Sequence, residues 1–489
     1  MSHTSTHQTE TDYLIVGSGA TGMAFADTLL TELPDAHITI VDRHGKPGGH
    51  WNDAYPFVAL HQPSAIYGVN SMELGERRID TVGVNKGLYE LATGPEINGY
   101  YDRVMNHRLL ASGRVSYHPM CNYLGEGRFV SLLSGAQTQV TVRRKTVNAK
   151  HFSPSVPATH KPKFSVAPGV WLVPPGGLVQ LWQAESRPAK RYVILGAGKT
   201  AMDVGVWLLK AGVASDAIHW VMPRDSWLIN RQYIQPGLEF FKDSIGGQAD
   251  QMEAFASATS IDDLYDRLEA CGAHLRIDTT RRPTMFHLAS ISRGEVELLR
   301  HIKNVVRMGH VLAITASELV LEQGRLALDD CTVCIDCTAS AVEQRQIEPI
   351  FQADNIVLQV VRLPLPTFSA ALIAYVEAHY DDDAHKNTLC ASIPFPDSPA
   401  AYPASMLVSM MNQAAWGQDK ALRNWVRDSR LDGFGRVVAG ADPNNPEQMA
   451  ILGRLRSVAP AAAANLAKLA ATQRHAARAN PHPTQTPPA

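Results

Sequence analysis

The chain has 489 residues, of which 45% are hydrophobic and 19% charged, and its formal net charge is -2. This length predicts two or three domains, and the near-neutral charge argues against nucleic acid or an anionic membrane surface as a partner. The polar start MSHTSTHQTETD lacks the apolar core of a signal peptide, and no apolar run reaches the roughly 18 residues of a membrane helix, so we expect a cytoplasmic protein.

A glycine fingerprint opens the first predicted unit. The apolar residues 13–16 predict a buried strand, and Gly17, Gly19 and Gly22 follow with G-x-G-x-x-G spacing ahead of a helical pattern. The next apolar strand ends in Asp42, at about the 20-residue spacing expected of the ribose-binding acid. In such a unit the glycines let the backbone approach a pyrophosphate at the helix N-terminus, so we predict a dinucleotide site here.

A connecting region follows the first unit. Residues 94–110 predict a helix, and residues 114–118, 127–134 and 138–144 predict a small antiparallel meander. Residues 153–177 contain six prolines and are interpreted as a crossing between domains.

A second fingerprint begins after the apolar strand 191–195. Gly196, Gly198 and Ala201 occupy its three positions, with alanine in the allowed third place, and Lys199 and Thr200 lie at the expected helix N-terminus. No acid ends the following strand; Arg224 stands there instead. A guanidinium binds a 2'-phosphate that an acid would repel, so this unit favours NADPH, with Arg231 as a second candidate contact.

The remaining chain contains a helical insert near 238–305, a cysteine run and a C-terminal helix at 461–479. Cys331, Cys334 and Cys337 lie in a β-like segment, where the middle side chain faces away from the other two, so we expect buried strand cysteines and no metal. We interpret the segment as a strand that returns to the first domain.

The motifs together resemble the flavin-dependent monooxygenases with two dinucleotide domains, which include Baeyer–Villiger and N-hydroxylating enzymes. In that family GGxW follows the acid of the FAD fingerprint, and here GGHW spans Gly48–Trp51, with Tyr55 and Pro56 continuing the likeness. The family's linker motif is not legible, and His61 stands where Baeyer–Villiger members carry an acid. The chain is therefore identified as an outlying member.

The resemblance implies FAD in the first unit and NADPH in the second. It places Gly49, His50, Trp51 and Gln62 near the flavin, together with Thr338 and Ala339. It also implies a small organic substrate and O2, with oxygen inserted through a C4a-(hydro)peroxyflavin, either as a Baeyer–Villiger reaction or at a heteroatom. His61 is the candidate for proton control, because a histidine changes charge near neutral pH, and Arg282 is a candidate to face the nicotinamide or the peroxide.

Three other interpretations stay open. One is an NADPH-dependent flavin dehydrogenase or oxidase without oxygen insertion, and another is a non-catalytic redox sensor. A disulfide reductase would need a cysteine pair near the flavin, and the first 120 residues contain no cysteine. A homodimer is also left open.

The predicted fold is α/β, with an NADPH domain inserted into an FAD domain and a helical C-terminal region. The predicted FAD domain covers 10–165 and 331–430, and the NADPH domain covers 166–330. A helical segment at 431–475 and a disordered tail at 476–489 complete the expected organisation.

Overall fold

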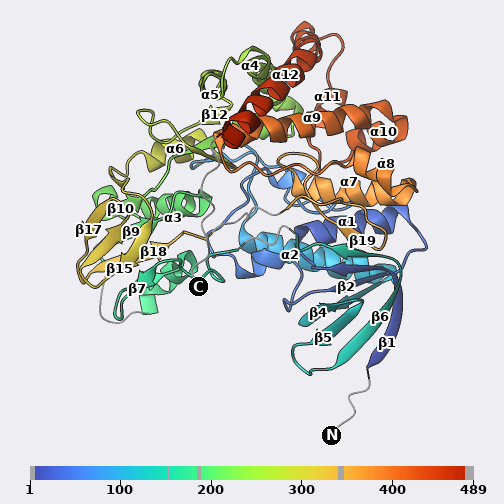
Figure 1. Cartoon of the computed structure of the whole chain (residues 1–489), viewed down its shortest axis with the longest axis horizontal. Helices are drawn as coiled ribbons and strands as arrows, with labels where there is room; N and C mark the ends of the chain where they lie inside the picture. Colours follow the sequence, from blue (N-terminus) through green and yellow to red (C-terminus); the bar gives the residue numbers. More distant parts are fainter. Residues whose placement is uncertain (1–5, 152–154, 184–188, 340–345, 480–489) are drawn as a thin grey trace.

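The structure, a computed structural model, describes residues 6–151, 155–183, 189–339 and 346–479. A mixed sheet and a parallel sheet, each with a glycine-rich turn, form two units, and a helical C-terminal region lies across them (Figure 1). The expected α/β class, with two Rossmann-like units and a helical C-terminus, is confirmed.

The first sheet has the order β3-β2-β1-β6-β5-β4, and one more strand pairs with β6. Its strands are β1 (His7–Val16), β2 (Ile38–Val41), β3 (Val115–His118), β4 (Cys121–Gly125), β5 (Arg128–Ser131), β6 (Gln137–Asn148) and β19 (Asn355–Val357). The segment at 114–118 is not part of a meander, because β3 pairs in parallel with β2 at the edge of the sheet. Only β4, β5 and the start of β6 form the antiparallel ribbon.

Helices cover this sheet. They are α1 (Ala20–Glu32), α2 (Gly94–Val104) and α7 (Pro366–His379). Thr93 and Glu96 form a capping box that starts α2. α7 is buried along most of its length in the same core as α1, so the first unit is completed by a helix far along the chain.

The second sheet is parallel throughout, in the order β14-β10-β9-β18-β8. Its strands are β8 (Leu172–Val173), β9 (Arg191–Leu195), β10 (Ile218–Val221), β14 (Asn304–Val306) and β18 (Thr332–Asp336), with helices α3 (Lys199–Lys210) and α6 (Arg293–Leu299). The cysteine strand β18 was expected in the first domain, and that prediction is wrong, because its backbone pairs with β9 and β8. The second unit therefore extends past residue 330.

Two smaller sheets flank the second unit. One contains β7 (Ser165–Val166), β15 (Val311–Ile314), β16 (Glu318–Leu321) and β17 (Gly324–Ala327). The other contains β11 (Ser226–Asn230), β12 (His274–Leu275) and β13 (Met285–Ile291), beside helices α4 (Gly247–Ser257) and α5 (Ile261–Ala270). The predicted insert is thus helical with a short sheet of its own.

The C-terminal region is formed by α8 (Asp383–Leu389), α9 (Tyr402–Gln418), α10 (Lys420–Asp428), α11 (Phe434–Ala439) and α12 (Pro446–Ala479). The last helix starts earlier than expected, continues beyond residue 475, and packs on α4 and α9 at the top of the view in Figure 1. Leu466 shares a core with Phe255 of the insert, which joins the two regions. Residues 480–489 of the predicted tail lie outside the described residues. Within the described chain, no helix is both long and apolar enough to cross a membrane.

Candidate functional site

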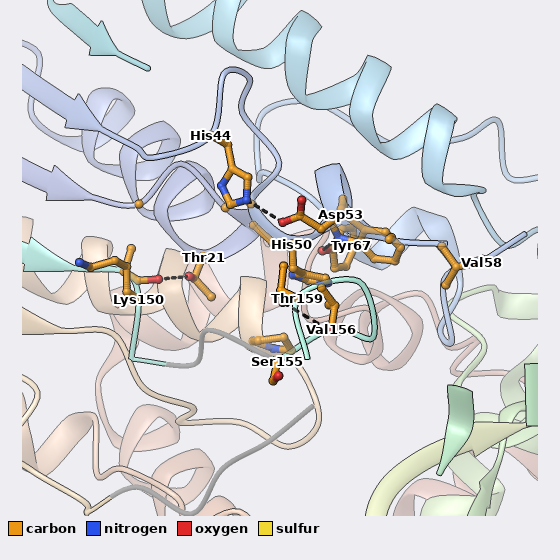
Figure 2. A pocket seen from close by; sticks show the side chains of 18 of the residues that line it. Thr21, His44, His50, Asp53, Val58, Tyr67, Lys150, Ser155, Val156 and Thr159 are labelled. Atoms are coloured by element: carbon orange, nitrogen blue, oxygen red, sulfur yellow. Dashed lines mark hydrogen bonds and ion pairs between the residues drawn. The ribbon is translucent and has the colours of Figure 1, made fainter. Parts of the chain in front are cut away.

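A cavity of about 810 Å³ lies between the two units and the C-terminal region. Its walls include the first glycine turn, the GGHW segment, residues 58–67 and strand β13. Ala339, shortly after the end of β18, also lines the cavity. Figure 2 shows the side chains that gather around it, among them Thr21, His44, His50 and Tyr67. The cavity is therefore the candidate site.

The paired glycines after Asp42 are explained by packing against the fingerprint turn. Gly49 has φ +59°, and a Cβ there would lie 2.9 Å from Cα of Gly19. The amide of Gly48 also donates to the carbonyl oxygen of Ser18 at 2.9 Å. Two loops meet backbone to backbone at this point, so no side chain fits between them.

The first and third fingerprint glycines are also required by geometry. Gly17 has φ +113°, a conformation that favours glycine, and it lines the cavity. A Cβ on Gly22 would lie 2.0 Å from the carbonyl oxygen of Gly17. The turn and the start of α1 therefore form a backbone-lined cradle with space for a phosphate.

Asp42 holds this cradle together. Its Oδ2 accepts hydrogen bonds from the amide and hydroxyl of Ser18 at 2.5 and 2.9 Å. Its Oδ1 accepts from the amide of His44 at 2.7 Å and contacts that ring's Nδ1 at 2.9 Å. A carboxylate has about four acceptor positions, so Asp42 lines the cavity with its acceptors already engaged by the protein.

His44, which the sequence reasoning missed, joins Asp42 to Asp53. Its Nε2 lies 2.8 Å from Oδ2 of Asp53, a contact drawn in Figure 2. Burial opposes protonation, but hydrogen bonds to Asp53 and Asp42 outweigh it and raise the pKa of His44 above its ordinary value. The ion pairs fix the loop that carries the GGHW segment.

Aromatic side chains form one wall of the cavity. The indole of Trp51 donates to the hydroxyl of Tyr67 at 2.8 Å, and the two rings meet edge to face. The ring of His50 lies against that of Trp51 at a tilt of 33°, with centroids 5.0 Å apart, and burial lowers the pKa of His50 to about 4. Gln62 also lines the cavity and donates to the carbonyl of Ile66 at 3.3 Å. These predicted flavin-side residues are thus brought together.

His61 lines the cavity and belongs to a closed ring of charged groups. Its Nε2 lies 3.4 Å from Oδ2 of Asp203, which is paired with Lys199 through its other oxygen. Lys199 Nζ lies 3.2 Å from Glu295, and Glu295 lies 2.9 Å from Arg231. Arg231 Nε then donates to the backbone carbonyl of His61 at 3.1 Å. The ring fixes His61 at both its side chain and its backbone.

The ring also sets the charges of its members. Burial lowers the pKa of His61, and Lys199 adds to the effect while Asp203 opposes it. Burial would raise the pKa of Asp203, but the charge of Lys199 and the contact with His61 bring it below its ordinary value. The hydroxyl of Tyr55 donates to Asp203 at 2.7 Å, and burial with this negative charge raises its pKa well above the usual value. Burial and the charge of Lys199 thus favour the neutral form of His61 beside a carboxylate.

Two residues that were predicted to contact the nucleotide belong instead to this ring of charged groups. Lys199 was expected to bind the cofactor at the helix N-terminus, but its side chain is 9% exposed and its ammonium is paired with Asp203 and Glu295. Arg231 was expected at a 2'-phosphate, but it is 1% exposed and its guanidinium also donates to Asn85 at 2.9 Å. Both side chains are committed to buried partners, and Arg231 joins the second unit to the first through Asn85 and the carbonyl oxygen of His61.

The second glycine turn is formed as expected. Gly196 has φ +117°, and a Cβ there would lie 2.7 Å from the carbonyl oxygen of Cys337. Gly198 precedes α3, and a Cβ on it would meet no atom within 4 Å in the described chain, so this turn faces open space. Thr200 lines the cavity, and Arg224 lies exposed just after β10. The side chain of Arg224 is thus open to solvent.

Other predicted residues are placed differently. Arg282 does not line the cavity; it is paired on the surface with Asp262 at 2.9 Å and with Asp266 at 2.8 Å, both on α5. Ala339 lines the cavity, whereas the hydroxyl of Thr338 donates to Asp336 at 2.6 Å. Two carboxylates of α5 pair with the guanidinium of Arg282, so the structure does not support its predicted catalytic role.

Arg430 is a further residue that the sequence did not single out. Its buried guanidinium donates to the carbonyl oxygens of Ala65 and Tyr67, each at 2.7 Å, and of Met72 at 2.6 Å. Burial lowers the pKa of Arg430. A C-terminal arginine thus fixes the backbone of the loop that carries Tyr67. No local sequence motif predicts this role of Arg430, because its partners are backbone carbonyl groups far away in the chain.

Cys334 lies in β18, Cys337 follows directly after it, and these two cysteines are buried in different cores, whereas Cys331 precedes the strand and is only half-buried. Cys334 packs with Leu195 and Leu321, whereas Cys337 packs with Ile194 on the other side of the sheet. Within the described residues, no three His, Cys, Asp or Glu side chains are grouped so as to hold a metal ion.

Comparison with known proteins supports the first nucleotide unit. Residues 15–70 match the family of NAD(P)-binding Rossmann-like domains. The FAD-dependent monooxygenase resA of Aspergillus sclerotiorum is 24% identical over 230 residues, which are 43% of this chain and 36% of that protein. A polycyclic ketone monooxygenase from Thermothelomyces thermophila aligns with a TM-score of 0.49 and 13% identity, covering 96% of this chain and 89% of that chain.

Two mycobacterial proteins are much more similar in sequence. The uncharacterised protein Rv2000 of Mycobacterium tuberculosis is 48% identical over 426 residues, which are 86% of this chain and 78% of that protein. The uncharacterised protein Mb2023 of Mycobacterium bovis gives the same identity over the same length. This chain therefore belongs to the protein family of Rv2000 and Mb2023.

Proposed function

We propose that this chain is a FAD- and NADPH-dependent monooxygenase. The observation that carries the proposal is a single cavity that touches the glycine turn of the first unit and the helix start of the second, at Gly17 and Thr200. The overall reaction would consume NADPH, a proton, O2 and an organic substrate, and yield NADP+, water and the oxygenated substrate. A relative named FAD-dependent monooxygenase, resA, supports the same class.

The first unit fits FAD. Its cradle is lined by backbone at Gly17 and Gly19, where a pyrophosphate needs close approach, and the wall at Trp51 and Tyr67 suits a flat ring. A bound flavin would accept a hydride from the nicotinamide and activate O2. The residues of this chain would orient that ring and exclude water from it.

The second unit fits NADPH. The turn at Gly198 faces open space, and the exposed guanidinium of Arg224 follows the neighbouring strand, where a 2'-phosphate would lie. In the described chain, Arg224 has no ion pair with an acidic side chain. The charge-assisted hydrogen bonds it could offer would favour NADPH over NADH.

His61 would hold or release one proton in this site. Its Nε2 faces the carboxylate of Asp203, which favours the tautomer with hydrogen on that atom. Nδ1 would then be the nitrogen that exchanges a proton with groups in the cavity. Asp203 thus orients the imidazole, in the way that a carboxylate fixes a histidine in other acid–base pairs.

The test is rapid mixing of the NADPH-reduced, FAD-loaded protein with oxygenated buffer. A monooxygenase should show a transient absorbance that precedes the return of the oxidised flavin spectrum. Reoxidation in one step, with one hydrogen peroxide released per NADPH with every substrate tried, would favour the NADPH dehydrogenase or oxidase instead.

A further inference from the structure

A loop of the first unit, residues 78–90, reaches across to the second unit, and we call it the strap. Its ends are joined by an antiparallel bridge between Ile79 and Tyr89. Asn85 lies inside the strap, where its side-chain amide donates to Oδ2 of Asp80 at 2.7 Å and to the carbonyl oxygen of Tyr89 at 3.0 Å. The strap is thus closed on itself, and Asn85 holds its two sides together.

The oxygen of the same Asn85 side chain faces the buried guanidinium of Arg231. It accepts a hydrogen bond from Nη1 of Arg231 at 2.9 Å, and Oε2 of Glu295 lies 2.9 Å from the same nitrogen. That nitrogen has two hydrogens, so Asn85 and Glu295 together engage both of them and fix the plane of the guanidinium. In this plane, Nε of Arg231 points to the carbonyl oxygen of His61 and donates to it at 3.1 Å.

The neighbouring strap residue, Val84, contacts the turn that carries Glu295. The hydroxyl of Ser292 donates to the carbonyl oxygen of Val84 at 2.6 Å and accepts from the amide of Glu295 at 3.1 Å. The amide of Ser292 donates to Glu295 at 2.8 Å in return, which completes the capping box of α6. The strap packs closely here, since a Cβ on Gly294 would lie 2.6 Å from the oxygen of Val84. The strap therefore supports the acid that the two cations of the ring share.

We propose that the strap positions His61, with Asn85 as a positioning residue that acts through Arg231. The inference rests on the proposed function, in which His61 exchanges a proton. Without Asn85, a buried N–H of Arg231 would lose its acceptor, and a buried donor without a partner favours another orientation of the guanidinium. The carbonyl oxygen of His61 would then lose a donor that holds it in place.

The surroundings of the His61 imidazole make its pKa a measure of this positioning. The acidic and basic groups around it are Asp203, Lys199 and Arg231 of the second unit and His50 of the first. Burial and the cations lower the pKa of His61, Asp203 opposes them, and the sum lies below the ordinary value. A released strap would admit water and loosen all these contacts, so the pKa would return toward its ordinary value.

Nuclear magnetic resonance measures this pKa without turnover. The oxidised, FAD-loaded protein would carry histidine isotope-labelled at Cε1, and the signal of His61 would be identified by its loss in His61→Ala. Asn85→Ala should raise the titration midpoint of His61 by about half a pH unit. The midpoint of His310, an exposed histidine elsewhere in the second unit, should not move. An unchanged His61 midpoint in Asn85→Ala would overturn the positioning role of Asn85.

Gly294 tests the strap from the opposite side, without changing any member of the charged ring. Gly294→Ala places a methyl group against the carbonyl oxygen of Val84, so it should displace the strap and raise the His61 midpoint as well. Gly453→Ala is the matched control, because Gly453 also lies within a helix and, in the part of the chain that the structure describes, a Cβ there meets nothing within 4 Å. Equal His61 midpoints in these two variants would overturn the role of the strap. If Asn85→Ala did not fold, this pair would decide alone.

Turnover separates this inference from the function on which it rests. The ratio of hydrogen peroxide formed to NADPH consumed would be measured across pH in Asn85→Ala and in the unmodified protein. A pH dependence of this ratio that moves with the His61 midpoint would support both. A moved midpoint with an unchanged ratio would contradict the proton-exchanging role of His61 and leave the strap in place. An unmoved midpoint in both Asn85→Ala and Gly294→Ala would overturn the strap, whatever the ratio.

Discussion

His61 is held at two points by residues of the second unit. Its side chain faces Asp203 on α3, and its carbonyl accepts from Arg231, which follows β11. The sequence predicted that this histidine lies at the site, and its place in the cavity agrees. The partners that orient it were not predicted, because they lie more than a hundred residues away and form no local pattern.

His61→Ala should release more of the electrons from NADPH as hydrogen peroxide, by about twofold or more, because the site loses its proton-exchanging group. The pKa of His61 lies below its ordinary value of 6.5, so the midpoint of the pH dependence of the leak in the unmodified protein should lie below that value. The ratio of peroxide formed to NADPH consumed, measured across pH, should become flat in the variant.

Asp203→Asn provides the companion measurement. The carboxylate favours protonated His61, so its removal should lower the pKa of His61 further and move the pH dependence of the leak to lower pH. If both variants leave the leak and its pH profile unchanged, His61 has only a structural role.

Gly49→Ala should lower flavin affinity on the order of tenfold, because the new Cβ would lie 2.9 Å from Gly19 and push the two loops apart. Gly113 is a matched control, since its φ is +69° and no atom of the described chain lies within 4 Å of an added Cβ. Gly113→Ala carries the same conformational strain without the close approach. Equal flavin content in the two purified variants would show that the Gly19–Gly49 contact does not matter.

Arg224→Ala should raise the KM for NADPH about tenfold to a hundredfold and leave that for NADH nearly unchanged. Only NADPH carries the 2'-phosphate that an exposed guanidinium after β10 would bind. Steady-state flavin reduction with both nucleotides is the measurement. Equal losses for the two nucleotides would place Arg224 in another role.

The sequence of strand β18 predicted the direction of its side chains but not the sheet to which the strand belongs. Alternation correctly indicated that Cys334 faces away from Cys337, and their separate cores agree. The sheet to which the strand belongs was predicted wrongly, because a short buried strand fits either sheet and backbone pairing decides between them. Similarly, the sequence predicted a strand at residues 114–118, but only the pairing of this strand with β2 places it at the edge of the first sheet.

The three cysteines in and beside β18 should be dispensable for redox chemistry. Replacing Cys331, Cys334 and Cys337 together by Ala should leave the flavin spectrum and NADPH oxidation intact. The free energy of unfolding should fall by about 1–2 kcal/mol, because buried side chains shrink. Metal analysis of the unmodified protein is the direct check, and one equivalent of iron or zinc would refute the prediction.

On the scale of the whole molecule, buried charge joins the two units. Glu295 of α6 lies between Lys199 and Arg231, and Arg231 reaches back to His61 and Asn85 of the first unit. Burial opposes ionisation, but these two cations lower the pKa of Glu295 to about 2. Removing one partner of such a cluster leaves uncompensated buried charge.

Glu295→Gln should lower the free energy of unfolding at pH 7 by about 3 kcal/mol. The folded pKa of Glu295 is depressed, so its contribution is full above the ordinary value of 4.5 and is lost as pH falls toward 2. Denaturant unfolding of the variant should therefore depend less on pH in that window. Glu297→Gln, an exposed position on the same helix, is the control and should change little.

The sequence by itself determined the two Rossmann-like units, and it singled out a histidine that lines the cavity. Glycine spacing, apolar strands and helical periodicity are local, and each is enforced within a few residues by backbone geometry, as at Gly17 and Gly22. It also placed Trp51 and Gln62 at the cavity. Local rules were sufficient wherever the structure depends on neighbours in the chain.

Only the tertiary structure decided how the charged residues are used. Lys199, Arg231 and Arg282 each looked free to bind a nucleotide or an intermediate, and each is paired with carboxylates brought near by folding. Arg430 stabilises a loop whose sequence gives no sign of it. A long charged side chain can reach many partners, and which of them it meets depends on how distant segments pack, because unpaired charge is too costly to bury.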